Sequence, residues 1–150
     1  MVYAVKDWDR HFEKSDTRKC KRMTWVAVPN KHDGKSYKRL AAHRRGLEIY
    51  AAWMLILQVA SKMPVRGVLQ DEDGPLDAED LAFMTSFPAE VFDMALEVLS
   101  GSKIAWLITQ DYHRHSGSSG SFGTASGNFA TTGQDKTGQL SVGSNNGSTY

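Results

Sequence analysis

Residues 76–109 constrain the fold more than any other part of the chain, and they read LDAEDLAFMTSFPAEVFDMALEVLSGSKIAWLIT. Asp77 is a residue type that caps helix N-termini, because its carboxylate accepts hydrogen bonds from the free N–H groups of the first turn. Glu79 and Asp80 follow in that turn, where the helix dipole favours negative charge. Pro88 suits the first turn of a second helix, because its missing N–H would have no partner there. The stretch therefore predicts two short consecutive helices.

The second predicted helix has a broad apolar face, because its apolar residues recur three and four positions apart. They are Val91, Phe92, Ala95, Leu96, Val98 and Leu99. Gly101 suits the end of this helix, because glycine adopts a left-handed conformation without steric cost. Residues 104–109 are rich in β-branched and aromatic side chains, which indicates a strand. Two helices running into a strand are typical of a winged helix-turn-helix domain, although an ordinary helical hairpin packed on a strand has the same pattern.

The most apolar segment is residues 46–63, GLEIYAAWMLILQVASKM. A helix that is apolar almost all round is either buried or spans a membrane. A membrane span needs about 20 apolar residues, and this run is shorter and carries Glu48 and Gln58. We therefore expect a buried first helix, whose stripe of Trp53, Met54 and Leu57 we interpret as core rather than as part of a ligand site. Residues 65–69 (VRGVL) then predict a short strand between the first and second helices.

The N-terminal part predicts less regular structure. Residues 2–5 indicate a short strand, residues 8–13 a helical turn or a loop, and residues 24–28 (TWVAV) another strand. Asp33-Gly34 is a strong turn signal. Two strands around that turn would form a hairpin. Residues 36–39 are polar, however, so the sequence does not predict the second strand firmly.

The composition changes from Ser116 onward, where Gly, Ser, Thr, Asn and Gln dominate. Such a segment buries too little apolar surface to offset the entropy lost on ordering. We expect an α+β fold divided into a basic N-terminal extension packed on the domain (residues 1–45), a winged-helix domain (46–112) and a disordered tail (113–150).

Charge is distributed unevenly along the chain, although the formal net charge is only +1. Residues 1–45 hold 13 Lys and Arg against 5 Asp and Glu, a balance of +8. Residues 46–115 hold 4 against 11, a balance of −7, and residues 116–150 hold one of each. A basic segment beside an acidic domain either folds back onto it or meets an anionic partner.

The basic segment is the most informative functional feature. Cations that follow a phosphate backbone, interleaved with aromatic rings that stack on bases, are what nucleic-acid binding without sequence preference requires. Here Trp25 and Tyr37 are interleaved with the cations. The predicted phosphate-binding residues are Arg18, Lys19, Lys21, Arg22, Lys35, Lys38, Arg39, Arg44 and Arg45. The alternative is a solvated basic loop, or one docked on the acidic part of the chain.

The second helix of the predicted helix-turn-helix is acidic. In DNA-reading proteins this helix enters the major groove. Glu90, Asp93 and Glu97 are three and four positions apart, so they predict one exposed acidic stripe that would face phosphates in a groove. Either the N-terminal segment contacts DNA, or the domain binds protein.

The sequence contains few patterns that indicate catalysis or metal binding. The chain has no GxxxxGK[ST], HExxH, GxSxG or GxGxxG motif, which predicts no enzyme and no cofactor. His113 and His115 share a face only if they lie on a strand, and we interpret them as solvated rather than as metal ligands. A single cysteine, Cys20, excludes an internal disulfide and is interpreted as a spectator thiol. The lack of an apolar signal segment at the start of the sequence predicts a cytoplasmic protein that does not enter a membrane.

Several stretches resemble the N-terminal winged-helix region of phage and prophage replication-initiation proteins, the replisome organisers akin to DnaD-type primosomal proteins. They are VKDWDRHFE, TRKCKRMTWVAVPNKHDG, AAWMLILQVASK, RGVL and LDAEDLAFMTSFPAEVFDMALEVL, which together cover about residues 2–109. The resemblance implies a role in DNA replication, through DNA or through a helicase-loading partner, and carries over no catalytic motif.

Together these features predict a non-enzymatic, DNA-associated accessory protein of phage or prophage replication initiation. Whether it binds single- or double-stranded DNA stays open, and replication proteins are its other expected partners. The alternative is a winged-helix module for protein–protein interaction or homo-oligomerisation that does not bind DNA.

Overall fold

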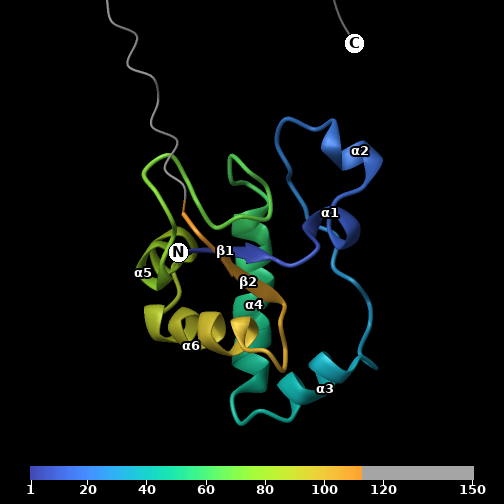
Figure 1. Ribbon diagram of the computed structural model, residues 1–150, viewed down its shortest axis with the longest axis vertical. Helices are drawn as coiled ribbons and strands as arrows, with labels where there is room; N and C mark the ends of the chain where they lie inside the picture. Colours follow the sequence, from blue (N-terminus) through green and yellow to red (C-terminus); the bar gives the residue numbers. More distant parts are fainter. Residues whose placement is uncertain (113–150) are drawn as a thin grey trace, which may run out of the picture. The chain divides into compact units, whose positions relative to one another are not determined.

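The long helix α4 organises the computed structural model, which describes residues 1–112 (Figure 1). These residues form a mixed α+β unit, so the predicted fold class is confirmed at that level. The predicted tail and the His113/His115 pair lie outside the described residues. In chain order the elements are β1 (Val2–Val5), α1 (Trp8–His11), α2 (Ser15–Arg18), α3 (Lys35–Ala41), α4 (Gly46–Ala60), α5 (Ala78–Thr85), α6 (Ala89–Ser100) and β2 (Leu107–Gln110).

Helix α4 is buried, as its apolar sequence predicts. Ile49, Ile56 and Leu57 are completely enclosed, and Trp53 is almost so. Helices α5 and α6 pack on one side of α4, while α1, α2 and α3 lie on the other (Figure 1). No helix within residues 1–112 has the length and apolar character needed to cross a membrane.

Helix α5 begins as predicted, whereas the start and the end of α6 differ in detail from the prediction. The Asp77 carboxylate accepts a hydrogen bond from the Asp80 N–H, and the Asp80 carboxylate accepts one from the Asp77 N–H, both at 3.0 Å. Pro88 is the residue before the first turn of α6 rather than part of it. Gly101 does end α6, but its φ of −58° shows that the predicted left-handed conformation is wrong.

The strand predicted over residues 104–109 starts three residues later, at Leu107. The chain leaves α6 through a tight turn in which the N–H groups of Ile104 and Ala105 both donate to the carbonyl of Gly101. Ala105 takes a left-handed conformation, with φ +50°. A strand cannot include such a residue, so β2 begins after it.

The N-terminal strand β1 has backbone partners on both of its edges. It pairs antiparallel with β2, with Tyr3 opposite Thr109. On its other edge the Val5 N–H donates to the carbonyl of Gly67 (2.7 Å), and the Leu69 N–H donates to that of Tyr3 (2.8 Å). The strand predicted over residues 65–69 is therefore reduced to an isolated bridge beside β1.

The strand predicted over residues 24–28 is wrong, because this segment has no regular structure. Val26 and Val28 are half-buried against the core, so the segment covers the core without pairing to either strand. Trp25 is instead 61% exposed. The hairpin around Asp33-Gly34 is also absent, because residues 35–41 form helix α3.

The basic first third of the chain contributes to the same core as α4–α6. Val5, Trp8, Phe12 and Leu40 are buried in one cluster with Trp53. The Trp8 ring stacks on that of Phe12 with centroids 5.3 Å apart. The cations of this segment therefore project from a packed scaffold.

Candidate nucleic-acid interface

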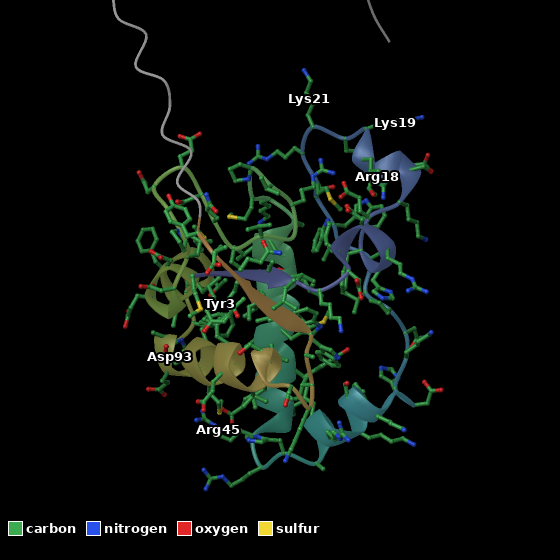
Figure 2. The ribbon with its side chains drawn as sticks, in the orientation of Figure 1. Tyr3, Arg18, Lys19, Lys21, Arg45 and Asp93 are labelled. Atoms are coloured by element: carbon green, nitrogen blue, oxygen red, sulfur yellow. The ribbon has the colours of Figure 1, made fainter. Side chains whose placement is uncertain are left out.

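The nine predicted phosphate-binding residues form two groups. Arg18, Lys19, Lys21 and Arg22 lie at and just after the end of α2, and we call them the α2 group. Lys35, Lys38, Arg39, Arg44 and Arg45 lie on α3 and in the turn that leads into α4, and we call them the α3 group. Figure 2 shows Arg18, Lys19 and Lys21 together at the α2 end, with Arg45 at the opposite end of the ribbon.

These cations are available to an outside partner. Eight of the nine are exposed, and only Arg45 is half-buried. Within residues 1–112 the ion pairs are Arg45–Glu48 and Arg66–Glu13, so Arg45 is the one predicted residue held by a carboxylate. None of the nine is paired with a carboxylate of α5 or α6 in this part of the chain.

Positive and negative charge are separated in space as well as in sequence. The predicted acidic stripe of Glu90, Asp93 and Glu97 is exposed along α6. Helices α5 and α6 lie on the side of α4 away from α1–α3 (Figure 1), and Asp93 and Lys19 lie on opposite sides of the ribbon (Figure 2). The α2 group therefore lies away from the acidic stripe, whereas in the α3 group Arg45 is close enough to Glu90 of α6 for that carboxylate to contribute to its raised pKa.

Arg45 differs from the other eight because Glu48 neutralises it across a 2.5 Å ion pair. The hydrogen bond from Arg45 lowers the pKa of the Glu48 carboxyl, and the same bond raises the pKa of Arg45. The carboxyl pKa is depressed on folding, so the pair's stabilisation is present above the unfolded pKa and is lost as pH falls through the folded one. Arg45 is thus the weakest candidate among the nine for a phosphate contact.

The α2 group is held in place by Arg66, which the sequence analysis missed. The Arg66 guanidinium pairs with the Glu13 carboxylate and donates to the carbonyls of Thr17 (2.8 Å) and Cys20. The Thr17 hydroxyl in turn bonds the backbone of Lys14. Charge-assisted bonds of this kind order a segment that has little apolar surface of its own. The sequence signal for this role is that Arg66 is the one charged residue in the apolar run VRGVL.

The α3 group is anchored to the turn after α6. Nη1 of Arg39 donates to the carbonyl of Lys103 at 2.9 Å, across 64 residues of sequence. Lys35 and Lys38 stay exposed along α3. Arg39 therefore combines a structural contact with an exposed charge, and variants meant to remove charge alone should leave it in place.

Next to the α3 group is a cavity of about 430 Å³, bounded by α1, residues 28–37, α4 and residues 104–106. Five aromatic side chains line it, and we call it the aromatic pocket: Phe12, Tyr37, Tyr50, Trp53 and Trp106. Tyr37 was noted in the sequence as one of the interleaved aromatic residues. Tyr50 and Trp53 are one helical turn apart on α4, whereas Phe12 and Trp106 come from distant parts of the chain.

Other candidate sites gain no support from the geometry. Asp71, Glu72 and Asp73 form an acidic run that could suggest a cation site, but the Asp71 carboxylate accepts hydrogen bonds from the N–H groups of Asp73 (2.9 Å) and Gly74 (3.0 Å) and so caps its own turn. No cluster of three or more His, Cys, Asp or Glu side chains suited to a metal ion occurs between residues 1 and 112. Cys20 is exposed.

No protein-family model, curated protein or solved structure matches this chain. The fold and the candidate site together define a mixed α+β protein with eight exposed cations that pair with no carboxylate in residues 1–112.

Proposed function

We propose that this protein binds nucleic acid through the α2 and α3 groups and acts as a non-enzymatic accessory protein of DNA replication. The observation that carries the proposal is the set of eight exposed cations that pair with no carboxylate in residues 1–112. Had the basic segment served only to neutralise the acidic helices, its side chains would reach those carboxylates.

Phosphate binding is favoured because each cation that meets a phosphate releases a condensed counterion. Such contacts fix position and add affinity without reading sequence. The ordered scaffold adds to this effect, because Arg66 and Arg39 fix the segments that carry the cations before any ligand arrives. The account therefore predicts binding with strong salt dependence and little sequence preference.

We further propose that residues 46–112 form a winged-helix domain with an inserted strand. The succession of α4, the bridge residue Val68, α5, α6 and β2 supports this proposal, and β1 lies between Val68 and β2. Its second helix, α6, presents the acidic stripe and does not enter a DNA groove in this proposal. The resemblance to phage replication-initiation proteins supports replication as the setting and replication proteins as additional partners.

Removing charge from each basic group tests the proposal. One variant carries Gln at Arg18, Lys19, Lys21 and Arg22, and the other carries Gln at Lys35, Lys38 and Arg44. Each is expected to weaken oligonucleotide binding at low salt by about tenfold or more and to flatten the salt dependence. The measurement is fluorescence anisotropy with a labelled strand and a labelled duplex.

The matched control carries Gln at Lys62, an exposed cation outside both groups. It is expected to bind as the native chain does. Unchanged binding in both group variants, or an equal loss in the control, would show that the two groups are not the interface.

A second candidate function, a protein-interaction or homo-oligomerisation module, is favoured by an apolar patch on α5 and the turn after it. Phe83 is 90% exposed and Phe87 54% exposed, and Met84 lies between them. Large apolar side chains gathered on a surface mark interaction sites. Light scattering over a concentration series tests this: a mass that rises in the native chain but not in a Phe83→Ser, Phe87→Ser variant supports it, and a constant monomer mass opposes self-association.

A further inference from the structure

We propose that the aromatic pocket receives one unstacked base of a single-stranded nucleic acid, with the neighbouring phosphates held by Lys31 and Lys35. The inference rests on the proposed function and deepens it, because it makes the preferred ligand a single strand. It is carried by the placement of an aromatic cavity beside the α3 group.

The size and lining of the pocket suit a flat aromatic ligand. Its volume of about 430 Å³ lies within the range of small-molecule sites, roughly 300–1,000 Å³. Phe12 and Trp53 are buried beneath it, whereas Tyr37, Tyr50 and Trp106 are half-buried and reach solvent. Aromatic rings at the opening of an apolar pocket can stack on any of the bases, because every base has a π-face.

Contacts among the rings hold the pocket in shape. Tyr37 packs edge-on against Tyr50 at 5.7 Å between centroids, and Tyr50 packs against Trp106 at 6.4 Å. Trp53 lies 5.4 Å from Trp106 and 6.0 Å from Phe12. Each ring is therefore positioned by its neighbours, which reduces the ordering cost of binding a base.

The rim of the pocket carries the charge that a nucleotide needs. Lys6, Lys31 and Lys35 line it and are exposed, against one carboxylate, Asp7. None of these four side chains is in an ion pair within the described part of the chain. The rim therefore attracts a phosphate while the aromatic interior takes the base.

The pocket is continuous with the proposed interface, because Lys35 belongs both to its rim and to the α3 group. A strand that follows the α3 group thus passes the opening of the pocket. A duplex keeps its bases paired and stacked inside, so a base enters the pocket only from a single strand or at the cost of extrusion. The geometry therefore favours single strands over duplexes.

The test compares four ligands by anisotropy and tryptophan fluorescence with the full chain. They are a short oligothymidine strand, the same strand with abasic sites, a duplex of equal length, and free thymidine monophosphate. The intact strand is expected to bind about tenfold more tightly than the abasic strand, the difference typical of one stacked base. It is also expected to quench tryptophan fluorescence and to bind more tightly than the duplex.

Variants at Tyr37 make the test specific to the pocket. Tyr37→Ala is expected to lose about tenfold in affinity for the intact strand and to keep its affinity for the abasic strand, whereas Tyr37→Phe retains both. Phe83→Ala is the control, because Phe83 is exposed on α5, far from the basic segment in sequence, and does not line the pocket. The salt dependence of strand binding should be the same in all three variants.

Equal affinity for intact and abasic strands overturns the pocket proposal while leaving the proposed function standing. Free nucleotide that binds as tightly as the strand also overturns it, because the ligand is then a mononucleotide. Absence of binding to every strand and duplex at low salt overturns the proposed function itself. The abasic comparison in the native chain needs no variant, so it decides the matter even if Tyr37→Ala misfolds.

Discussion

Replacing Gly67 with alanine is expected to destabilise the protein by about 2–5 kcal/mol, from backbone strain and overpacking together. Gly67 has a φ of +83°, a conformation that costs an L-residue roughly 1–2 kcal/mol. A Cβ there would lie 2.5 Å from Cγ of Trp8. The Trp8 ring cannot easily retreat, because it is buried and stacked on Phe12. Gly67 also bonds both Ala60 and Val5, so the backbone cannot shift without breaking the link between α4 and β1.

Urea denaturation followed by circular dichroism measures this change. Gly34→Ala is the control, because no atom lies within 4 Å of a Cβ at Gly34 and its φ is −64°. We expect that control to change the free energy of unfolding by about 1 kcal/mol or less. A similarly small loss for Gly67→Ala would mean that Trp8 does not pack against residue 67 as described.

Phe92→Ala is expected to cost about 3–5 kcal/mol, the range for deleting a fully enclosed aromatic ring. Phe92 is 0% exposed on the face of α6 that packs toward α4 and α5. Truncation leaves a cavity that the surrounding helices only partly close. Since small domains are stable by about 5–15 kcal/mol, the variant should be close to unfolding at physiological temperature.

The matched control for Phe92→Ala is Phe83→Ala, the same substitution on the neighbouring helix α5. Phe83 is 90% exposed, so its truncation should change the free energy of unfolding by about 0.5 kcal/mol or less. Thermal unfolding of both variants beside the native chain gives the comparison. If the two variants lost similar free energy of unfolding, Phe92 would not be enclosed by α4 and α5 as described.

The helices could be predicted because their determinants are local. The reciprocal Asp77–Asp80 cap is visible three residues apart, and the apolar run of α4 is continuous in sequence. The strands were harder, because a strand also needs a partner from a distant part of the chain. Residues 24–28 have β-forming side chains but pair with neither β1 nor β2. β2 begins only after Ala105, which has a left-handed backbone conformation. Alanine rarely adopts this conformation, so the sequence gives no signal for it.

The sequence predicts which basic residues belong to the candidate site, but not how the fold arranges them. Lys and Arg side chains are exposed in most proteins, so the sequence alone predicts the nine basic residues as surface cations. Their freedom from the carboxylates of α5 and α6 depends on how the chain folds. The support from Arg66 comes from 46 residues away or more, and the aromatic pocket joins residues as distant as Phe12 and Trp106. No spacing rule connects such positions.

The most direct test of the central claim is the affinity of the full chain for a single-stranded oligonucleotide at several salt concentrations. If four to eight of the exposed cations meet phosphates, log K should fall linearly with log salt, with a slope of about −3 to −6. A slope near zero, or no binding at low salt, would contradict the account and leave the basic surface without the anionic partner proposed for it.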